Sequence, residues 1–167
     1  VISGLSALHS NNIMHRDIKA SNIFLMENDS IKIGDFNIGK EVGESTMYTK
    51  IGTPVMMSPE IWNGENYNFK TDIWSLGCLV YQMATLKPPF LAESYAALYL
   101  KISKCKVPNI SNYPKSLNTF IQKLLKKNPK QRPSCQDLLK FEEFKKFGEN
   151  SSKVPKILPG LSKLNNL

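Results

Sequence analysis

Cysteine is scarce in this sequence, and the few cysteines present show no pattern. The 167 residues contain three, Cys78, Cys105 and Cys135. Their number is odd, which argues against a paired disulfide framework, and their spacing is not that of metal ligands. The cysteines therefore favour a reducing intracellular compartment.

Long hydrophobic runs, a signal peptide and internal repeats are also lacking. No apolar stretch is long enough to cross a bilayer, so we expect no membrane partner. The start has no secretory pattern, which favours a cytoplasmic protein, with the nucleus or the cytoskeleton as alternatives. The chain begins at Val1 rather than Met, in the middle of a helical pattern, and we expect it to be a fragment.

The charge is unevenly distributed along the chain. The net charge is +8, but residues 1–100 carry seven Lys/Arg and ten Asp/Glu, while residues 101–167 carry fifteen and four. A basic half can mark a nucleic-acid surface. However, most lysines of residues 101–146 fall on the polar faces of amphipathic helices. A solvated basic surface that docks a partner is favoured, and nucleic-acid binding is the weaker reading.

The apolar pattern predicts a mainly α protein with one small β-hairpin. Residues 1–10 read as the end of a helix, and residues 23–26 and 31–33 as two short strands. Residues 71–86 are apolar on every side and predict a buried helix. Further helices are expected over residues 93–103 and 116–127, and one opens at Ser134 with a capping-box pattern.

The chemistry concentrates in the loop from His15 to Asn22. Within eight residues it holds a carboxylate at Asp17, an ammonium at Lys19 and an amide at Asn22. These groups suit phosphoryl transfer to a hydroxyl, in which an aspartate accepts the proton, a lysine neutralises phosphate charge and an asparagine binds a metal. A second carboxylate, Asp35, follows the predicted hairpin. Antiparallel pairing would bring it near Asn22, and hard oxygen ligands of this kind suit Mg2+.

Five motifs in a fixed order resemble those of eukaryotic protein kinases. They are His15-Arg16-Asp17-x-Lys19-x-x-Asn22, Asp35-Phe36-Asn37, Ser58-Pro59-Glu60, Asp72-x-Trp74-Ser75-x-Gly77 and Arg132. A lysine two residues after the aspartate, as at Lys19, resembles the pattern of serine/threonine kinases rather than that of tyrosine kinases. Met-Ser-Pro-Glu-Ile and Thr-Leu-Lys-Pro-Pro-Phe resemble the NIMA-related kinases. The resemblance implies a kinase C-terminal lobe over residues 1–147, without the N-terminal lobe, and a flexible basic tail over residues 148–167.

The resemblance implies an enzyme that transfers the γ-phosphate of ATP, with Mg2+, to Ser/Thr hydroxyls of protein substrates. Asp17 would orient the hydroxyl and accept its proton, and Lys19 would steady the γ-phosphate. Asn22 and Asp35 would bind Mg2+, and Thr53 would bridge Asp17 and Lys19. The apolar residues 54–57 would receive the substrate residue beyond the target.

Regulatory and structural roles are also implied. Thr49 is the preferred activating phosphorylation site, with Thr46 and Ser45 behind it, and Arg16 would pair with the phosphate. The competing reading is that these hydroxyls only solubilise a loop. The expected structural residues are His15, Asp72 bound to the catalytic-loop backbone, and a buried pair of Glu60 with Arg132.

Two departures from the family pattern leave alternatives open. Asn37 stands where the family has glycine, and it should bias or reduce activity because a left-handed residue costs energy without a glycine. The Gly-rich loop, the strand lysine and its glutamate partner are absent. These departures motivate a pseudokinase scaffold as the main alternative. A small-molecule phosphotransferase of kinase-like fold is a third reading. Such enzymes lack the Thr-Pro…Ser-Pro-Glu segment that this sequence contains.

Overall fold

The computed structural model describes residues 1–27, 30–35 and 54–141, and within them it is mainly helical. The elements are α1 (Ile2–Ser10), η1 (Ala20–Asn22), β1 (Ile23–Leu25), β2 (Ile31–Ile33), η2 (Pro54–Met56), α2 (Pro59–Trp62), α3 (Lys70–Thr85), α4 (Tyr95–Lys104), α5 (Lys115–Leu124), η3 (Pro129–Gln131) and α6 (Cys135–Leu139). Strands β1 and β2 form a two-stranded antiparallel sheet. The predicted fold class, helices with one small hairpin, is confirmed.

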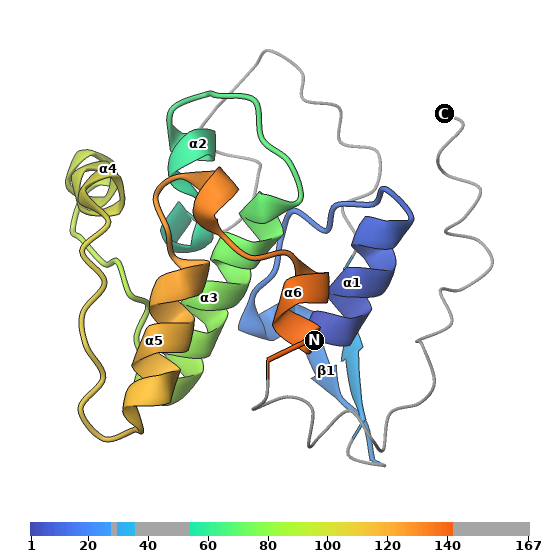
Figure 1. Cartoon of the computed structure of the whole chain (residues 1–167). Coiled ribbons are helices and arrows are strands. Elements are labelled where there is room, and N and C mark those ends of the chain that lie inside the picture. Colours follow the sequence, from blue (N-terminus) through green and yellow to red (C-terminus); the bar gives the residue numbers. More distant parts are fainter. Residues whose placement is uncertain (28–29, 36–53, 142–167) are drawn as a thin grey trace.

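Helix α3 runs through the middle of the molecule, and the other helices are arranged around it (Figure 1). Helix α5 packs along α3, and α1 packs against α6. Because α3 is covered on several sides, ten of its residues from Thr71 to Tyr81 are buried. This agrees with the apolar pattern of the segment, which lacks a polar face.

The apolar core has two parts that share α3. The first cluster joins α3 to α2, α4 and α5, and its members include Met56, Trp62, Trp74, Tyr81, Phe90, Leu98 and Ile121. The second cluster joins α3 to α1, α6 and the loop after α1, and its members include Leu5, Leu8, Ile18, Ile73, Leu76, Leu124 and Leu138. Ile18 belongs to the loop that carries the expected catalytic residues, so the second cluster anchors that loop.

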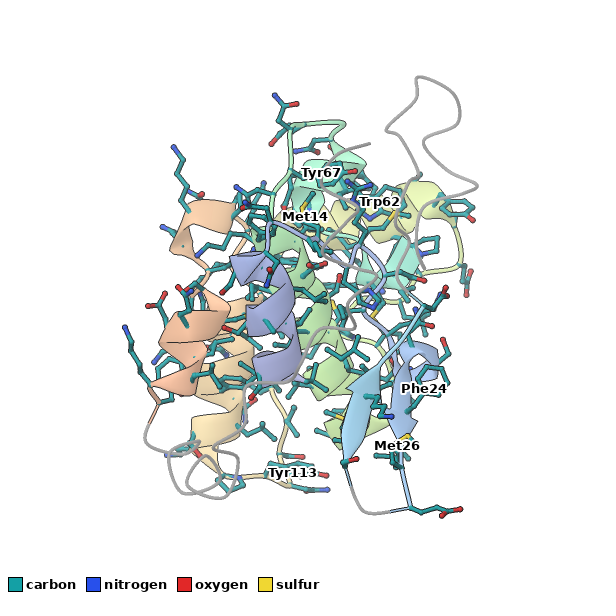
Figure 2. The ribbon with its side chains drawn as sticks, turned by 90° about the vertical axis from the view of Figure 1, so that its right-hand side faces the viewer. Met14, Phe24, Met26, Trp62, Tyr67 and Tyr113 are labelled. Atoms are coloured by element: carbon teal, nitrogen blue, oxygen red, sulfur yellow. The ribbon has the colours of Figure 1, made fainter. Side chains whose placement is uncertain are left out.

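The hairpin presents one apolar pair to the core and several apolar side chains to solvent. Ile23 pairs with Ile33, and both pack against the second cluster. Phe24 and Leu25 are 50% and 78% exposed. Figure 2 shows Phe24 and Met26 along this hairpin. Since an isolated two-stranded hairpin is marginally stable in water, the packing of Ile23 and Ile33 must hold it in place.

Helix ends follow local capping chemistry, which explains small differences from the sequence prediction. Helix α4 begins at Tyr95 rather than at residue 93 because Ser94 accepts a hydrogen bond from the Ala97 amide. The predicted capping box at Ser134 is present, with Asp137 as its partner. The short α2 was not predicted, because four residues carry too little periodicity to be recognised.

The expected tail over residues 148–167 and its boundary at residue 147 lie outside the described residues. Within the described ranges, none of the helices combines the length and the apolar character that crossing a bilayer requires.

Gly77 lies where α3 packs closely against the end of α5. A Cβ at this position would lie 2.9 Å from both Leu124 and Leu125 side-chain atoms. We expect Gly77→Val to lower the free energy of unfolding by about 1–3 kcal/mol through overpacking. Urea denaturation measures the change. Met83→Val introduces the same side chain at an exposed position of α3 and serves as the control. Equal effects of the two substitutions would contradict this packing.

Candidate active site

The loop between α1 and η1 brings together the three polar groups that the sequence singled out. The Lys19 ammonium lies 2.6 Å from Oδ2 of Asp17. The amide nitrogen of Asn22 donates to the Asp17 carbonyl at 2.8 Å and to Oδ2 of Asp17 at 3.1 Å. Asp17 is 7% exposed, so these partners compensate a largely buried carboxylate. A carboxylate, an ammonium and an amide therefore occupy one small volume.

Asp72 holds this loop from the first turn of α3. Its Oδ1 accepts from the Arg16 amide at 2.9 Å, and its Oδ2 accepts from the His15 amide at 3.0 Å. The predicted contact between Asp72 and the loop backbone is thus present. Arg16 has φ 69°, a left-handed conformation that is uncommon outside glycine. The two hydrogen bonds to the buried carboxylate stabilise this strained backbone.

His9 is the third partner of Asp72, and the sequence analysis missed it. Its Nε2 lies 2.8 Å from Oδ2 of Asp72, and its Nδ1 lies 3.6 Å from the Cys135 sulfur. The available signal was a polar residue four positions after Leu5, on the buried side of α1. Burial is the largest influence on Cys135 and raises the pKa of its thiol to about 12. Cys135 is therefore a packing residue rather than a nucleophile.

His15 links the loop to the segment that precedes Asp35. Its Nδ1 accepts from the Asp17 amide at 3.3 Å, and its Nε2 lies 2.9 Å from the Gly34 carbonyl. The two contacts agree with the tautomer that carries its proton on Nε2. His15 is fully buried, consistent with the structural role expected for it.

The hairpin places Asp35 next to the catalytic loop. The Gly34 amide donates to the Asn22 carbonyl at 3.0 Å, which extends the strand pairing by one residue. Asp35 follows directly, with φ 56°. A Cβ at Gly34 would lie 2.6 Å from the Phe24 ring, so a larger residue there would require this half-exposed ring to move. The backbone thus brings Asp35 to within one residue of the hydrogen bond between Gly34 and Asn22. That its carboxylate shares a cation with Asn22 stays a prediction.

The donor set near Asn22 suits a hard cation that brings further ligands with it. Because the amide nitrogen of Asn22 is engaged with Asp17, its Oδ1 is the atom that could bind a cation. This oxygen also accepts a long hydrogen bond, 3.4 Å, from the Ser21 hydroxyl. Among the described residues, no group of three or more His, Cys, Asp or Glu could hold a metal alone. Asn22 and Asp35 would fit Mg2+, which commonly uses one or two protein oxygens together with phosphates and water.

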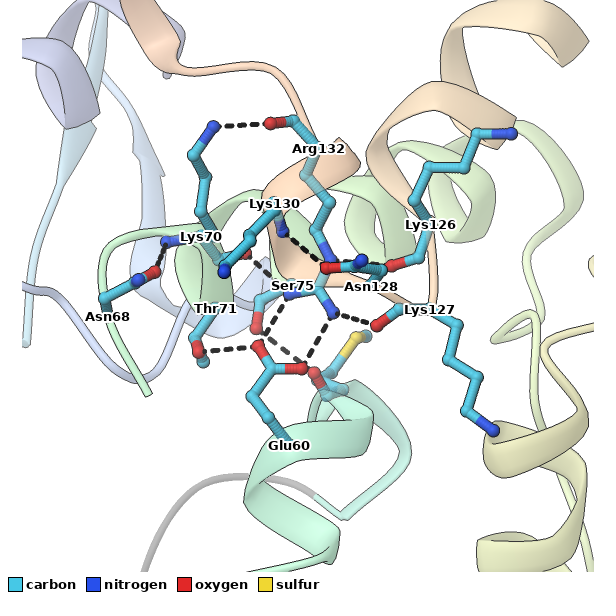
Figure 3. A network of polar contacts seen from close by, with 11 residues as sticks. Glu60, Asn68, Lys70, Thr71, Ser75, Lys126, Lys127, Asn128, Lys130 and Arg132 are labelled. Carbon is cyan, nitrogen blue, oxygen red and sulfur yellow. Dashed lines mark hydrogen bonds and ion pairs between the residues drawn. The ribbon is translucent and has the colours of Figure 1, made fainter. Parts of the chain in front are cut away.

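The predicted pair of Glu60 and Arg132 is present and buried (Figure 3). The guanidinium contacts both carboxylate oxygens of Glu60, at 2.6 and 2.7 Å. It also donates to the carbonyls of Lys70, Lys126 and Lys127. One side chain thereby ties α2, α3 and the segment after α5 together.

Further contacts support the Glu60–Arg132 pair. Thr71 donates to Oε1 of Glu60 at 3.0 Å, and the Arg132 guanidinium lies 5.0 Å from the centre of the Trp74 ring. Burial alone would raise the pKa of Glu60. The hydrogen bonds and charge of Arg132 outweigh that effect and hold the pKa of Glu60 below its ordinary value.

Several expected site residues cannot be placed. Thr53, Thr49, Thr46 and Asn37 lie outside the described residues, as does Ser45. The expected bridge of Thr53 to Asp17 and Lys19 and the phosphate partnership of Arg16 therefore stay predictions.

The family is shown by comparison with known proteins. The model of the protein kinase domain matches residues 1–144, so the chain belongs to the protein kinase family. The chain is 40% identical to probable serine/threonine-protein kinase nek2 of Dictyostelium discoideum, over 99% of its own length. It is 39% identical to mouse Nek3 and 42% identical to human Nek5, in each case over 93% of its length. The predicted resemblance to the NIMA-related kinases is confirmed.

The chain spans only part of these relatives. It covers 40% of the Dictyostelium protein, 30% of mouse Nek3 and 22% of human Nek5. Protein kinases as a family use ATP and Mg2+ and act on protein substrates.

Arg132→Lys should destabilise the protein by about 1–3 kcal/mol, because an ammonium cannot contact both Glu60 oxygens and the surrounding carbonyls at once and leaves buried acceptors unsatisfied. Lys keeps the charge, so the loss reports the geometry of the guanidinium. Thermal or urea unfolding measures it. Lys130→Arg, at an exposed neighbouring site, is the control and should leave stability within about 0.5 kcal/mol.

Glu60 also predicts a pH dependence of stability. Its pKa is lower in the folded state than the ordinary 4.5, so its contribution is fully present above that pH. The contribution should be lost as the pH falls below 4.5, through the folded-state pKa. Unfolding of the wild type and of Glu60→Gln, compared at pH 7 and below 4.5, tests this. A difference between the two proteins that does not shrink in acid would refute it.

Proposed function

We propose that the chain is the C-terminal lobe of a NIMA-related serine/threonine kinase, which transfers the γ-phosphate of ATP to Ser/Thr hydroxyls of protein substrates. The parent enzyme would supply the N-terminal lobe that binds the nucleotide from the other side. The similarity to kinases that are longer than this chain supports this division. The chain alone would bind ATP poorly.

The observation that carries the proposal is the cluster of Asp17, Lys19 and Asn22. The contacts of Lys19 and Asn22 both fall on Oδ2 of Asp17. This leaves Oδ1 as the atom that we assign to the substrate hydroxyl. A carboxylate held in one orientation by two donors is suited to accept the hydroxyl proton as the phosphoryl group transfers.

Lys19 has a second task in the proposed reaction. The Lys19 side chain is 27% exposed, and its ammonium lies beside Asp17, the assigned base. From there it can contact a phosphoryl oxygen while remaining close to Asp17. This would stabilise negative charge on the transferring group, which is the main demand that phosphoryl transfer makes on a protein.

Asn22 and Asp35 would hold the metal through Oδ1 and the carboxylate. Bound Mg2+ neutralises the phosphate charge that develops during transfer. The fixed amide of Asn22 orients its Oδ1, and the hydrogen bond from the Gly34 amide to the Asn22 carbonyl supports the backbone that leads to Asp35. Such preorganisation lowers the cost of binding.

A pseudokinase scaffold is the second candidate, favoured by one residue. Asn37 replaces the glycine of the metal motif, where the family's backbone must flex. The intact Asp17, Lys19, Asn22 and Asp35 support catalysis instead.

The proposal also includes activation by phosphorylation of Thr49 or Thr46, with Arg16 as the partner of the phosphate. It includes a cytoplasmic location.

Asp17→Asn in the intact protein tests the two candidates directly. We expect kcat for phosphorylation of a protein substrate to fall by about 10²–10⁴-fold, because the proton acceptor is lost while the shape is kept. The melting temperature should change little. Glu93→Gln removes an exposed carboxylate elsewhere and should leave kcat unchanged. Equal phosphorylation rates for wild type and Asp17→Asn would favour the scaffold.

A further inference from the structure

A cavity lined by aromatic rings lies between the end of α2 and the start of α4. It is open to solvent, has a volume of about 680 Å3 and is lined by Trp62, Asn63, Tyr95, Ala96 and Tyr99. The Trp62 ring lies 6.3 Å from the Tyr95 ring and 6.1 Å from the Tyr99 ring, measured between centroids, with tilts of 51° and 46°. We call this site the aromatic cavity. This volume lies within the range of ligand-binding sites and has room for a long side chain of a partner.

The rings of the aromatic cavity are held by the fold. Tyr95 and Tyr99 are four residues apart on α4 and share one face of the helix. Ser94 caps this helix through the Ala97 amide at 3.2 Å, which fixes its first turn. Trp62 is only 8% exposed and belongs to the first cluster, whereas Tyr95 is 56% exposed. The cavity therefore has a rigid aromatic floor and an accessible aromatic wall.

A chain of hydrogen bonds connects the cavity to a carboxylate. The Tyr99 hydroxyl donates to Oδ1 of Asn63 at 3.1 Å, and Nδ2 of Asn63 donates to Oε1 of Glu65 at 2.8 Å. Each donor in this chain points toward the negative charge of Glu65, and such chains polarise their members. This increases the electron density of the Tyr99 ring and places the Glu65 carboxylate one hydrogen bond away from Asn63, a lining residue.

The charge of the lining selects against an anion. None of the five lining residues is basic. The nearby Lys101 on α4 donates its ammonium to the Leu91 carbonyl at 2.6 Å. Aromatic faces attract cations through the ring quadrupole, and Trp and Tyr do so most strongly. The ring faces and the carboxylate thus favour the same sign of ligand.

We propose that the aromatic cavity binds an arginine side chain of a protein partner. A guanidinium is planar, so it can stack on the exposed Tyr95 ring and still donate to the Glu65 carboxylate in its plane. A lysine ammonium is a compact, strongly hydrated charge and gains less from stacking. The site would serve as a docking point for a basic segment, whether that segment is a substrate or a regulator. It does not depend on phosphoryl transfer by Asp17.

Binding can be tested with short peptides and the intact protein. The probes are acetylated, amidated Gly-Arg-Gly and the same peptide with citrulline, which keeps the shape of arginine but lacks its charge. The readout is the indole N–H signal of Trp62 in NMR spectra. Trp74 is the internal reference, because it is fully buried and stacked on Phe90. We expect the Trp62 signal to shift as the arginine peptide is added. The dissociation constant for the citrulline peptide should be about tenfold higher.

Variants locate the site. Tyr95→Ala should weaken arginine binding about tenfold, and Glu65→Gln about threefold or more. Tyr113→Ala removes another exposed tyrosine, which lies far from Trp62 in Figure 2, and should leave binding unchanged. Equal binding of the citrulline peptide, tighter binding of a lysine peptide, or arginine binding that survives Tyr95→Ala would each overturn the proposal.

Discussion

One buried carboxylate on the central helix positions the rest of the site. Asp72 is 1% exposed and accepts hydrogen bonds from two consecutive backbone amides, those of His15 and Arg16, and a further contact from His9. An ionised carboxylate in the interior is tolerated only when its lone pairs are satisfied. Asp72 can therefore be buried only when the loop is formed, because the loop amides satisfy its carboxylate. The left-handed Arg16 and the orientation of Asp17 both follow from it.

Helix α3 connects the loop that carries Asp17 to the apolar core and to Arg132. The same helix provides Asp72 to the loop, side chains to both apolar clusters and the Lys70 carbonyl to Arg132. Arg132 in turn fixes α2 through Glu60, and α2 ends beside the aromatic cavity. Helix α3 thus supports both sites, the candidate active site through Asp72 and the proposed docking site through Arg132 and α2. This arrangement suits groups that must keep their geometry to within fractions of an ångström.

Sequence reasoning predicted the features that local chemistry determines. The hairpin, the buried α3 and the capping box at Ser134 followed from periodicity and capping rules, and the grouping of Asp17, Lys19 and Asn22 followed from their nearness in the chain. The pair of Glu60 with Arg132 came only from the family resemblance. His9 was missed because its partners, Asp72 and Cys135, lie 63 and 126 residues away. The aromatic cavity was missed for the same reason, since α2 and α4 meet only in the folded chain.

The small sheet has a consequence for how the protein should respond to its ligands. Two three-residue strands, with Phe24, Leu25 and Ile31 facing water, carry Asp35 at their end. Little apolar area holds them, so the hairpin should open locally far more often than α3 does. A cation bridging Asn22 and Asp35 would close that opening and slow amide hydrogen exchange in both strands. Hydrogen exchange in the hairpin would then depend on whether the cation is bound, whereas exchange in α3 would not change.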